Sequence, residues 1–242
     1  MAQVVCEWGL AGIQAWAGQA AVFVIVDVLS FSTSTSVALD QGASVIPFPH
    51  GEPEAAEAEA ARLGAIAASR DRTLAGRPSL SPASLKTLSA GSRLLLPSPN
   101  GSRLSLATGP AATYCACLRN ASQVARAAAE AAGAGVIAVI PAGEQWPDAA
   151  HRPAVEDWLG AGAVIQALEG LRNAEASLAC AAYRDAGPGL AGLIRDCRSG
   201  QELIHRGFEA DLDIALEMGA GRATPRLVDG VYVDVSGHAP TK

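Results

Sequence analysis

The sequence predicts an α/β fold with a mostly parallel sheet, and two features of the chain lead to that prediction. Apolar runs rich in β-branched residues, such as 21–29 (AVFVIVDVL) and 136–143 (VIAVIPAG), have the pattern of strands that are buried on both faces. Segments with helical spacing, such as 120–135, lie between these runs. Strands separated by helices pair in parallel through right-handed crossovers, so the alternation predicts one or two α/β units.

Apolar runs place the expected strands, and start and stop residues place the helices. Gly42 ends the first helix, Pro53 suits the first turn of the second, and Asn120 caps a later one. The strands are expected at 3–8, 21–29, 43–48, 65–69, 92–98, 112–118, 136–143 and 228–235. The helices are expected at 33–42, 51–65, from about 102 onward, 120–135, 154–170 and 173–218, the last with a break at 187–189.

A segment rich in Gly, Ser and Pro, residues 70–83, interrupts this alternation. Such a segment marks either a domain boundary or a flap over an active site. We therefore expect an N-terminal α/β subdomain at 1–90 and a C-terminal α/β subdomain at 91–242, with the site between them.

Composition excludes several classes of protein. Half of the 242 residues are hydrophobic, which is enough for a buried core, and the net charge is −6 with only two Lys. Without a basic block, binding to nucleic acid or to an anionic membrane is not expected. The apolar runs are too short to span a bilayer, and the N-terminus does not resemble a signal peptide. We therefore expect a cytoplasmic protein. The five Cys are scattered and odd in number, which is typical of small buried side chains.

An acid followed by hydroxyls marks the first candidate site. Asp27 ends an apolar strand, and six of the next residues in 29–37 are Ser or Thr. Ligands of open parallel sheets bind at the carboxyl ends of strands, where a lone carboxylate suits Mg²⁺. Ser32 and Thr33 open a helix whose N–H groups favour an anion, although hydroxyls there also serve as ordinary caps.

Two further segments contain polar residues that are candidates for a ligand site. In 97–104 (PSPNGSRL), Asn100 and Gly101 permit a tight turn near a ligand, and Arg103 offers a forked cation for an anion; the alternative is an ordinary turn. Glu156 and Asp157 begin a helix of small and apolar residues. They are either a second metal ligand and a general base, or acids that favour the helix dipole.

Together these segments resemble the 2-phosphosulfolactate phosphatases of coenzyme M biosynthesis. The similar stretches are 24–48 (VIVDVLSFSTSTSVALDQGASVIPF), 97–104, 117–125 (CLRNASQVA), 141–165 (PAGEQWPDAAHRPAVEDWLGAGAVI) and a tail at 207–233. The resemblance implies a three-layer α/β/α fold of two packed parts. It also implies a Mg²⁺-dependent hydrolase that converts 2-phosphosulfolactate to sulfolactate and phosphate.

The resemblance assigns roles to individual residues. It implies catalytic roles for Asp27, Arg103, Glu156 and Asp157, and we expect Asp27 to hold Mg²⁺ with the help of Asp157 or Glu156. It implies substrate binding by Ser32, Thr33, Asn100, Gly101 and Ser102, the last of which replaces the usual Thr. The expected partner is a small anionic substrate, and a homo-oligomer stays open.

Two departures from the family pattern concern its anion clamp, by which we mean the arginines expected to bind the anionic substrate. Ser30 stands where the family has Arg after D-V-L, and 67–72 (AASRDR) replaces its G-G-E-R segment. Loss of a fixed guanidinium predicts weak hydrolysis of 2-phosphosulfolactate, unless Arg70, Arg72 or Arg77 takes its place. The alternatives are an anion-binding or regulatory protein that retains the fold, and a hydrolase for another small phosphorylated acid.

Overall fold

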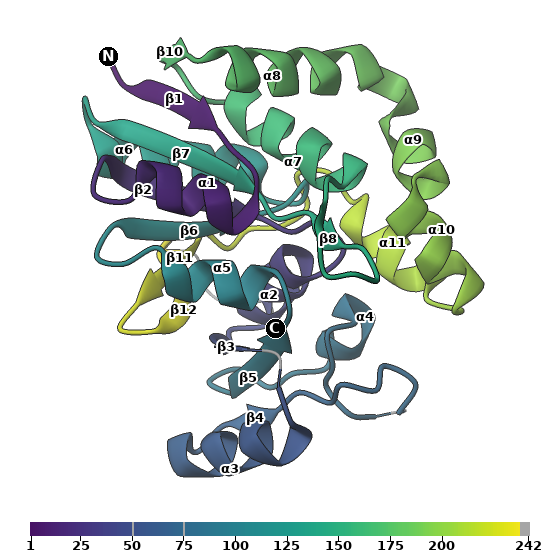
Figure 1. Ribbon diagram of the computed structural model, residues 1–242. Helices are drawn as coiled ribbons and strands as arrows, with labels where there is room; N and C mark the ends of the chain where they lie inside the picture. Colours follow the sequence, from purple (N-terminus) through teal and green to yellow (C-terminus); the bar gives the residue numbers. More distant parts are fainter. Residues whose placement is uncertain (50, 75, 238–242) are drawn as a thin grey trace.

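A computed structural model describes residues 1–49, 51–74 and 76–237, and in it a single ten-stranded sheet runs through the molecule (Figure 1). The strand order is β10-β1-β7-β2-β6-β11-β12-β3-β5-β4. These strands are β1 (Gln3–Cys6), β2 (Ala20–Val26), β3 (Ser44–Pro49), β4 (Ile66–Ala67), β5 (Arg93–Ser98), β6 (Ala112–Ala116), β7 (Val136–Pro141), β10 (Leu171–Arg172), β11 (Pro225–Val228) and β12 (Val231–Asp234). A separate hairpin consists of β8 (Glu144–Gln145) and β9 (His151–Arg152).

Helices connect most of the strands. They are α1 (Gly9–Trp16), α2 (Phe31–Asp40), α3 (Pro53–Leu63), α4 (Pro82–Leu85), α5 (Gly101–Ala107), α6 (Ala121–Ala132), α7 (Val155–Gln166), α8 (Ala174–Ala186), α9 (Leu190–Asp196), α10 (Arg198–His205) and α11 (Glu209–Ala215), with a 3₁₀ turn at Gly187–Gly189. Within the described residues, no helix is both long and apolar enough to cross a membrane.

Two antiparallel strands divide the sheet into halves. Within each half the strands are parallel to one another. One half contains β10, β1, β7, β2 and β6, and the other contains β3, β5 and β4. Between these groups, β11 and β12 form a hairpin that pairs antiparallel with β6 on one side and β3 on the other. The sheet is therefore mostly parallel, as predicted, and its two halves run in opposite directions.

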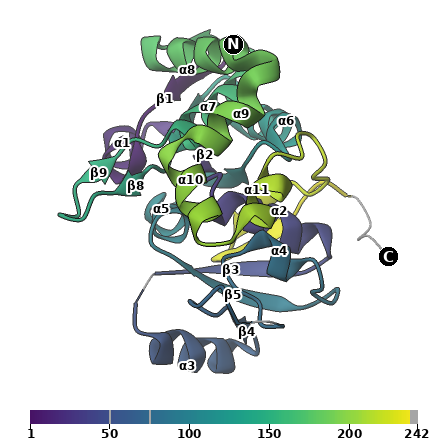
Figure 2. The ribbon, with the colours of Figure 1, turned by 90° about the vertical axis from the view of Figure 1, so that its right-hand side faces the viewer.

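Helices cover both faces of the sheet, which confirms the three-layer α/β/α fold. Alternate residues of β2 enter different cores: Val24 lies with α6, α7 and α8, whereas Phe23 and Ile25 lie with α1 and α5. In the other half, α2 and α4 share a core on one face, and α3 packs against Ile46 and Leu95 on the other. Figure 2 shows α3 beside β4 at one end of the molecule and α8 beside β1 at the opposite end.

Most expected elements are present, and six were missed: α1, α4, β8, β9, β10 and β11. Helix α1 falls where no helix was expected, β11 and the two-residue β10 were not foreseen, and the loop 144–153 contains the β8–β9 hairpin. Helix α2 ends at Asp40, and Gly42 follows with a positive φ of 78°, as expected of a C′ glycine. Strands from residues 1–90 and from residues 91–242 alternate within one sheet. The division into two subdomains at residue 90 stays a prediction.

Candidate functional site

Asp27 lies where two helices begin. Its Oδ1 accepts a hydrogen bond from the Phe31 N–H (3.1 Å), at the start of α2, and its Oδ2 accepts one from the Gly101 N–H (2.9 Å), at the start of α5. Helix N-termini have unpaired N–H groups and a positive dipole end, so they stabilise a carboxylate at this point. The structure thus brings Asp27 and Gly101 together, and their function stays a prediction.

The glycine at position 101 is a packing requirement. A Cβ there would come within 2.3–2.6 Å of the Phe31 ring and its Cβ, closer than side chains tolerate. Helix α5 can therefore approach Asp27 only because residue 101 has no side chain.

The hydroxyls after Asp27 bond to the protein itself. Ser32 Oγ accepts from the Asp27 N–H (2.9 Å), and Thr33 Oγ1 donates to the Val28 carbonyl (2.8 Å). Ser102 Oγ likewise donates to the Leu96 carbonyl (2.8 Å), and Ser32, Thr33 and Ser102 are fully buried. They shape the turns from strand to helix, and their contact with substrate stays a prediction. The Gly101 and Ser32 N–H groups donate to Asp27 as well, so they are not free to bind phosphate.

Asp157, on α7, joins the ends of two neighbouring strands. Its Oδ1 accepts from the Val28 N–H (2.7 Å) and its Oδ2 from the Gly143 N–H (2.9 Å), just beyond β2 and β7. Asp157 is therefore next to Asp27, as expected, and both of its oxygens already accept backbone hydrogen bonds. Asp157 thus links the turns that follow β2 and β7.

Glu144 belongs to the candidate site and was not identified by the sequence analysis. Its Oε2 accepts from Asn100 Nδ2 (2.9 Å), so the carboxylate after β7 meets the amide after β5. An acid immediately beyond a buried strand was the signal that identified Asp27, and the same signal was present here. Glu156, beside Asp157, is also buried, and its Oε2 accepts from the Cys197 thiol (3.3 Å).

We define the acidic cluster as Asp27, Glu144, Glu156 and Asp157; burial and mutual repulsion raise the pKa values of Asp27, Glu144 and Asp157. Burial raises the pKa of Asp27 to about 6, against the lowering effect of the Phe31 and Gly101 N–H groups. Burial and the charge of Asp27 raise the pKa of Glu144 to about 7. Burial and the charges of Glu156 and Asp27 raise the pKa of Asp157 well above its usual range. Such a cluster favours protons or a metal cation.

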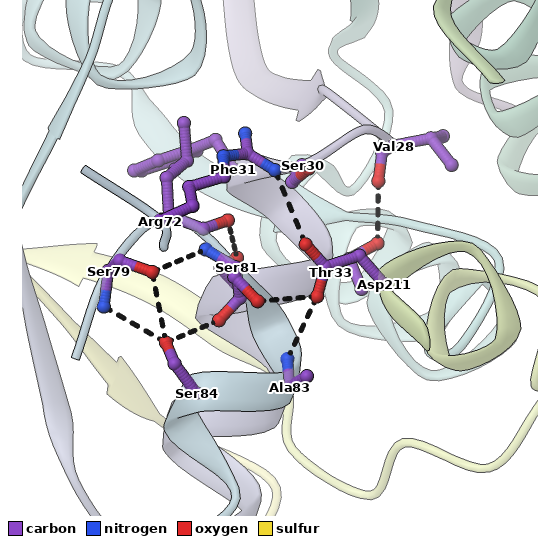
Figure 3. A network of polar contacts seen from close by, with 12 residues as sticks. Val28, Ser30, Phe31, Thr33, Arg72, Ser79, Ser81, Ala83, Ser84 and Asp211 are labelled. Atoms are coloured by element: carbon purple, nitrogen blue, oxygen red, sulfur yellow. Dashed lines mark hydrogen bonds and ion pairs between the residues drawn. The ribbon is translucent and has the colours of Figure 1, made fainter. Parts of the chain in front are cut away.

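Arg72 occupies the neighbourhood of Ser30. Its Nη1 donates to Ser30 Oγ (3.2 Å) and to Asp211 Oδ2 (3.4 Å) (Figure 3). Its guanidinium carbon lies 5.8 Å from the centre of the Phe208 ring. The charge of Arg72 also lowers the pKa of Asp27, which places the guanidinium near the acidic cluster. A residue of the 70–83 segment thus supplies a cation where the family pattern has an arginine at position 30.

Asp211 fixes this arrangement from α11. Its Oδ1 accepts from Ser81 Oγ (2.5 Å) and from the Ala83 N–H (3.2 Å), at the start of α4 (Figure 3). Asp211 thus ties α11 to the 70–83 segment while it pairs with Arg72. Because the two residues are 139 positions apart, their pairing left no signal in the sequence.

Arg103 lies on the first turn of α5, two residues after Gly101. It is exposed and lines a cavity of about 270 Å³ together with Asn100, Glu144, Trp8 and His151. Its predicted catalytic function is untested, and among the residues that the structure describes, Arg72 is the guanidinium whose charge acts on Asp27.

The donor set at the site fits magnesium. No three His, Cys, Asp or Glu side chains among the described residues are grouped to ligate one ion. Mg²⁺ needs only one or two carboxylates, because waters and substrate oxygens complete its shell. Asp27 and Glu156 meet that need: the charge of Glu156 acts on Asp27, and each carboxylate is buried among other acids.

Comparison with known proteins agrees with this geometry. A sequence model of one family, described as 2-phosphosulpholactate phosphatase, matches residues 13–230. The chain is also 31% identical over 209 residues to a protein of Methanothermobacter thermautotrophicus named 2-phosphosulfolactate phosphatase, which covers 86% of this chain and 87% of that protein. The matched span includes every residue of the acidic cluster as well as Arg72. The chain therefore belongs to the 2-phosphosulfolactate phosphatase family of enzymes.

Proposed function

We propose that this protein hydrolyses 2-phosphosulfolactate to sulfolactate and phosphate, with Mg²⁺ bound in the acidic cluster. The observation that carries the proposal is the environment of Asp27. This buried carboxylate accepts hydrogen bonds from the N-termini of two helices, and the positive charge of Arg72 acts on it. Family membership and the name of the related protein support the substrate. The cytoplasmic location, the role in coenzyme M biosynthesis and a homo-oligomer stay predictions.

Asp27 and Glu156 are the residues that would hold the metal. Asp157 was expected in this role and stays a third candidate ligand: its two oxygens accept the Val28 and Gly143 N–H groups, just as the two oxygens of Asp27 accept backbone N–H groups. When bound, Mg²⁺ would offset the charge between these carboxylates and the phosphoryl oxygens and favour deprotonation of water.

Arg72 is the proposed phosphate ligand. It is permanently charged and forked, and it is held by Ser30 and Asp211, so it can present a remaining N–H to a phosphoryl oxygen. Weak hydrolysis was expected because position 30 lacks an arginine, and the place of Arg72 removes the reason for that expectation.

Glu144 is the proposed general base. Its pKa of about 7 suits a group that exchanges protons near neutral pH, and Asn100 orients its carboxylate. Glu144 takes a proton from the attacking water, whose oxygen bonds to phosphorus. The bond from phosphorus to the ester oxygen breaks, and this oxygen leaves with a proton from solvent as the hydroxyl of sulfolactate.

Phosphate release from three compounds tests the proposal. Purified protein is incubated with 2-phosphosulfolactate, 2-phospholactate or phenyl phosphate, with Mg²⁺ or with EDTA. We expect fast release from 2-phosphosulfolactate with Mg²⁺ and little with EDTA. Release from none of the three would contradict the function, and equal release with EDTA would contradict the metal.

A further inference from the structure

A second cavity with a basic lining opens beside the acidic cluster. It measures about 380 Å³, and its wall is formed by the β8–β9 hairpin and α10 with the residues that follow it. Three arginines line it: Arg152, Arg198 and Arg206. Two acids, Glu144 and Glu202, also line the cavity, but the three guanidinium groups outnumber them, so the lining favours an anion.

Two of these arginines are held in place by an aromatic ring. The guanidinium carbons of Arg198 and Arg152 lie 4.9 Å and 5.7 Å from the centre of the Trp146 ring. Arg152 is buried and donates to Ser199 Oγ (3.3 Å), while Glu202 accepts from Arg198 Nε (2.9 Å). Contacts of this kind fix guanidinium groups in advance, so less entropy is lost when an anion binds.

Arg206 is the cation with most capacity for a ligand. It is exposed, and it forms no ion pair with any residue that the structure describes. Its guanidinium carbon lies 5.4 Å from the centre of the Phe208 ring, which also lies under Arg72. The charge of Arg206 lowers the pKa of Arg72, so the two guanidinium groups repel each other, and an anion near both would offset this repulsion.

Glu144 connects the cavity to the catalytic residues. It lines the cavity, it accepts from Asn100, and its pKa is influenced by both Asp27 and Arg152. A substrate whose phosphate lies between Asp27 and Arg72 would therefore have the rest of its body directed toward the three arginines. Sulfolactate carries two acidic groups besides the ester oxygen, and the proposed catalytic residues bind neither.

We propose that this arginine cavity is the subsite for the sulfonate end of the substrate, with Arg198 and Arg206 as its specificity-determining residues. The inference rests on the proposed function for the identity of the ligand. It goes beyond that function because it separates recognition of the sulfonate from catalysis at the phosphate. Arg152, which is buried and bonded to Ser199, supports the subsite from below.

Binding of the product tests the subsite without turnover. Calorimetry compares sulfolactate with lactate, which lacks the sulfonate, for the wild type, Arg198→Ala, Arg206→Ala and the control Arg126→Ala, an exposed arginine on α6. We expect the Kd for sulfolactate to rise about 10-fold or more in both cavity variants, as loss of a charged hydrogen bond implies, and to stay unchanged in the control. Unfolding midpoints equal to the wild type would show that the variants fold.

Kinetics provide the second readout. For 2-phosphosulfolactate, KM should rise about 10-fold in Arg206→Ala, whereas the control Arg126→Ala should keep the KM and kcat of the wild type. Unchanged affinity for sulfolactate in both cavity variants would overturn the subsite, even if the wild type is an active phosphatase. Arginine-dependent binding of sulfolactate by a wild type that releases no phosphate would support the subsite and contradict the proposed function alone.

Discussion

At the scale of residues, the anion clamp depends on a side chain far from the position where the sequence pattern located it. The sequence correctly identified the absence of an arginine at position 30 and named Arg72 among three candidates to replace it. Only the structure distinguishes Arg72 from Arg70 and Arg77, because its guanidinium contacts Ser30 and Asp211. Tertiary pairing of this kind has no local periodicity from which it could be inferred.

Replacement of Arg72 by Ala is expected to lower kcat/KM for 2-phosphosulfolactate by about 10- to 150-fold. This range corresponds to a lost hydrogen bond to a charged group, about 1.5–3 kcal/mol. Arg77→Ala is the matched control, since Arg77 belongs to the same segment, is exposed and is 4.0 Å from Glu57. Equal kcat/KM in the two variants would refute the role of Arg72.

Glu144 gives the reaction a pH dependence of known sign. A general base must be deprotonated to act, so kcat/KM should fall as pH falls below the pKa of about 7. Glu144→Gln keeps the shape and the contact with Asn100 but cannot take a proton, so it should be slow at every pH and lack that slope. A variant with the wild-type rate and profile between pH 5 and 9 would assign the base to another residue.

At the scale of elements, helices and strands with strong sequence patterns were predicted well, and those with weak patterns were missed. The doubly buried strand β2 and the Ala-rich helix α6 were placed within a few residues. Helix α1 was missed because it is short, contains two glycines and has no side-chain cap. Strand β11 begins at Pro225, a residue that ordinarily argues against a strand, and the β11–β12 hairpin reverses half of the sheet.

The close approach of α5 to α2 makes Gly101 sensitive to substitution. Gly101→Ala should destabilise the protein by about 1–3 kcal/mol, because the added methyl overlaps Phe31 in a packed core. Gly192→Ala in α9 is the matched control: a Cβ there meets nothing within 4 Å, so it should be neutral or stabilise by up to about 1 kcal/mol. Chemical denaturation measures both, and a neutral Gly101→Ala would show that the two helices are not packed as described.

At the scale of the whole molecule, the acidic cluster should make stability depend on pH and on metal. The folded-state pKa of Glu144 is raised from 4.5 to about 7, so its favourable contribution is complete below about pH 4.5 and is lost as pH rises through 7. The free energy of unfolding of Glu144→Gln, relative to that of the wild type, should therefore increase by on the order of 3 kcal/mol as pH rises from 5 to 8, at about 1.4 kcal/mol per pKa unit.

Denaturation of both proteins without metal checks this difference. Added Mg²⁺ should raise the unfolding midpoint of the wild type more at pH 8 than at pH 5, because the carboxylates must be deprotonated to bind it. A difference between Glu144→Gln and the wild type that does not change with pH would mean that Glu144 titrates normally.

The central claim is that Asp27, at the meeting point of two helices, holds the metal for phosphate release. The most direct measurement is the initial rate of phosphate release from 2-phosphosulfolactate by the wild type and by Asp27→Asn, across a titration of Mg²⁺ at pH 7.5. The amide keeps the shape of the side chain and loses the charge, so we expect saturable activation of the wild type and a rate at least about 100-fold lower in the variant, a loss of about 2.7 kcal/mol in transition-state stabilisation. A variant that responds to Mg²⁺ as the wild type does would contradict the claim.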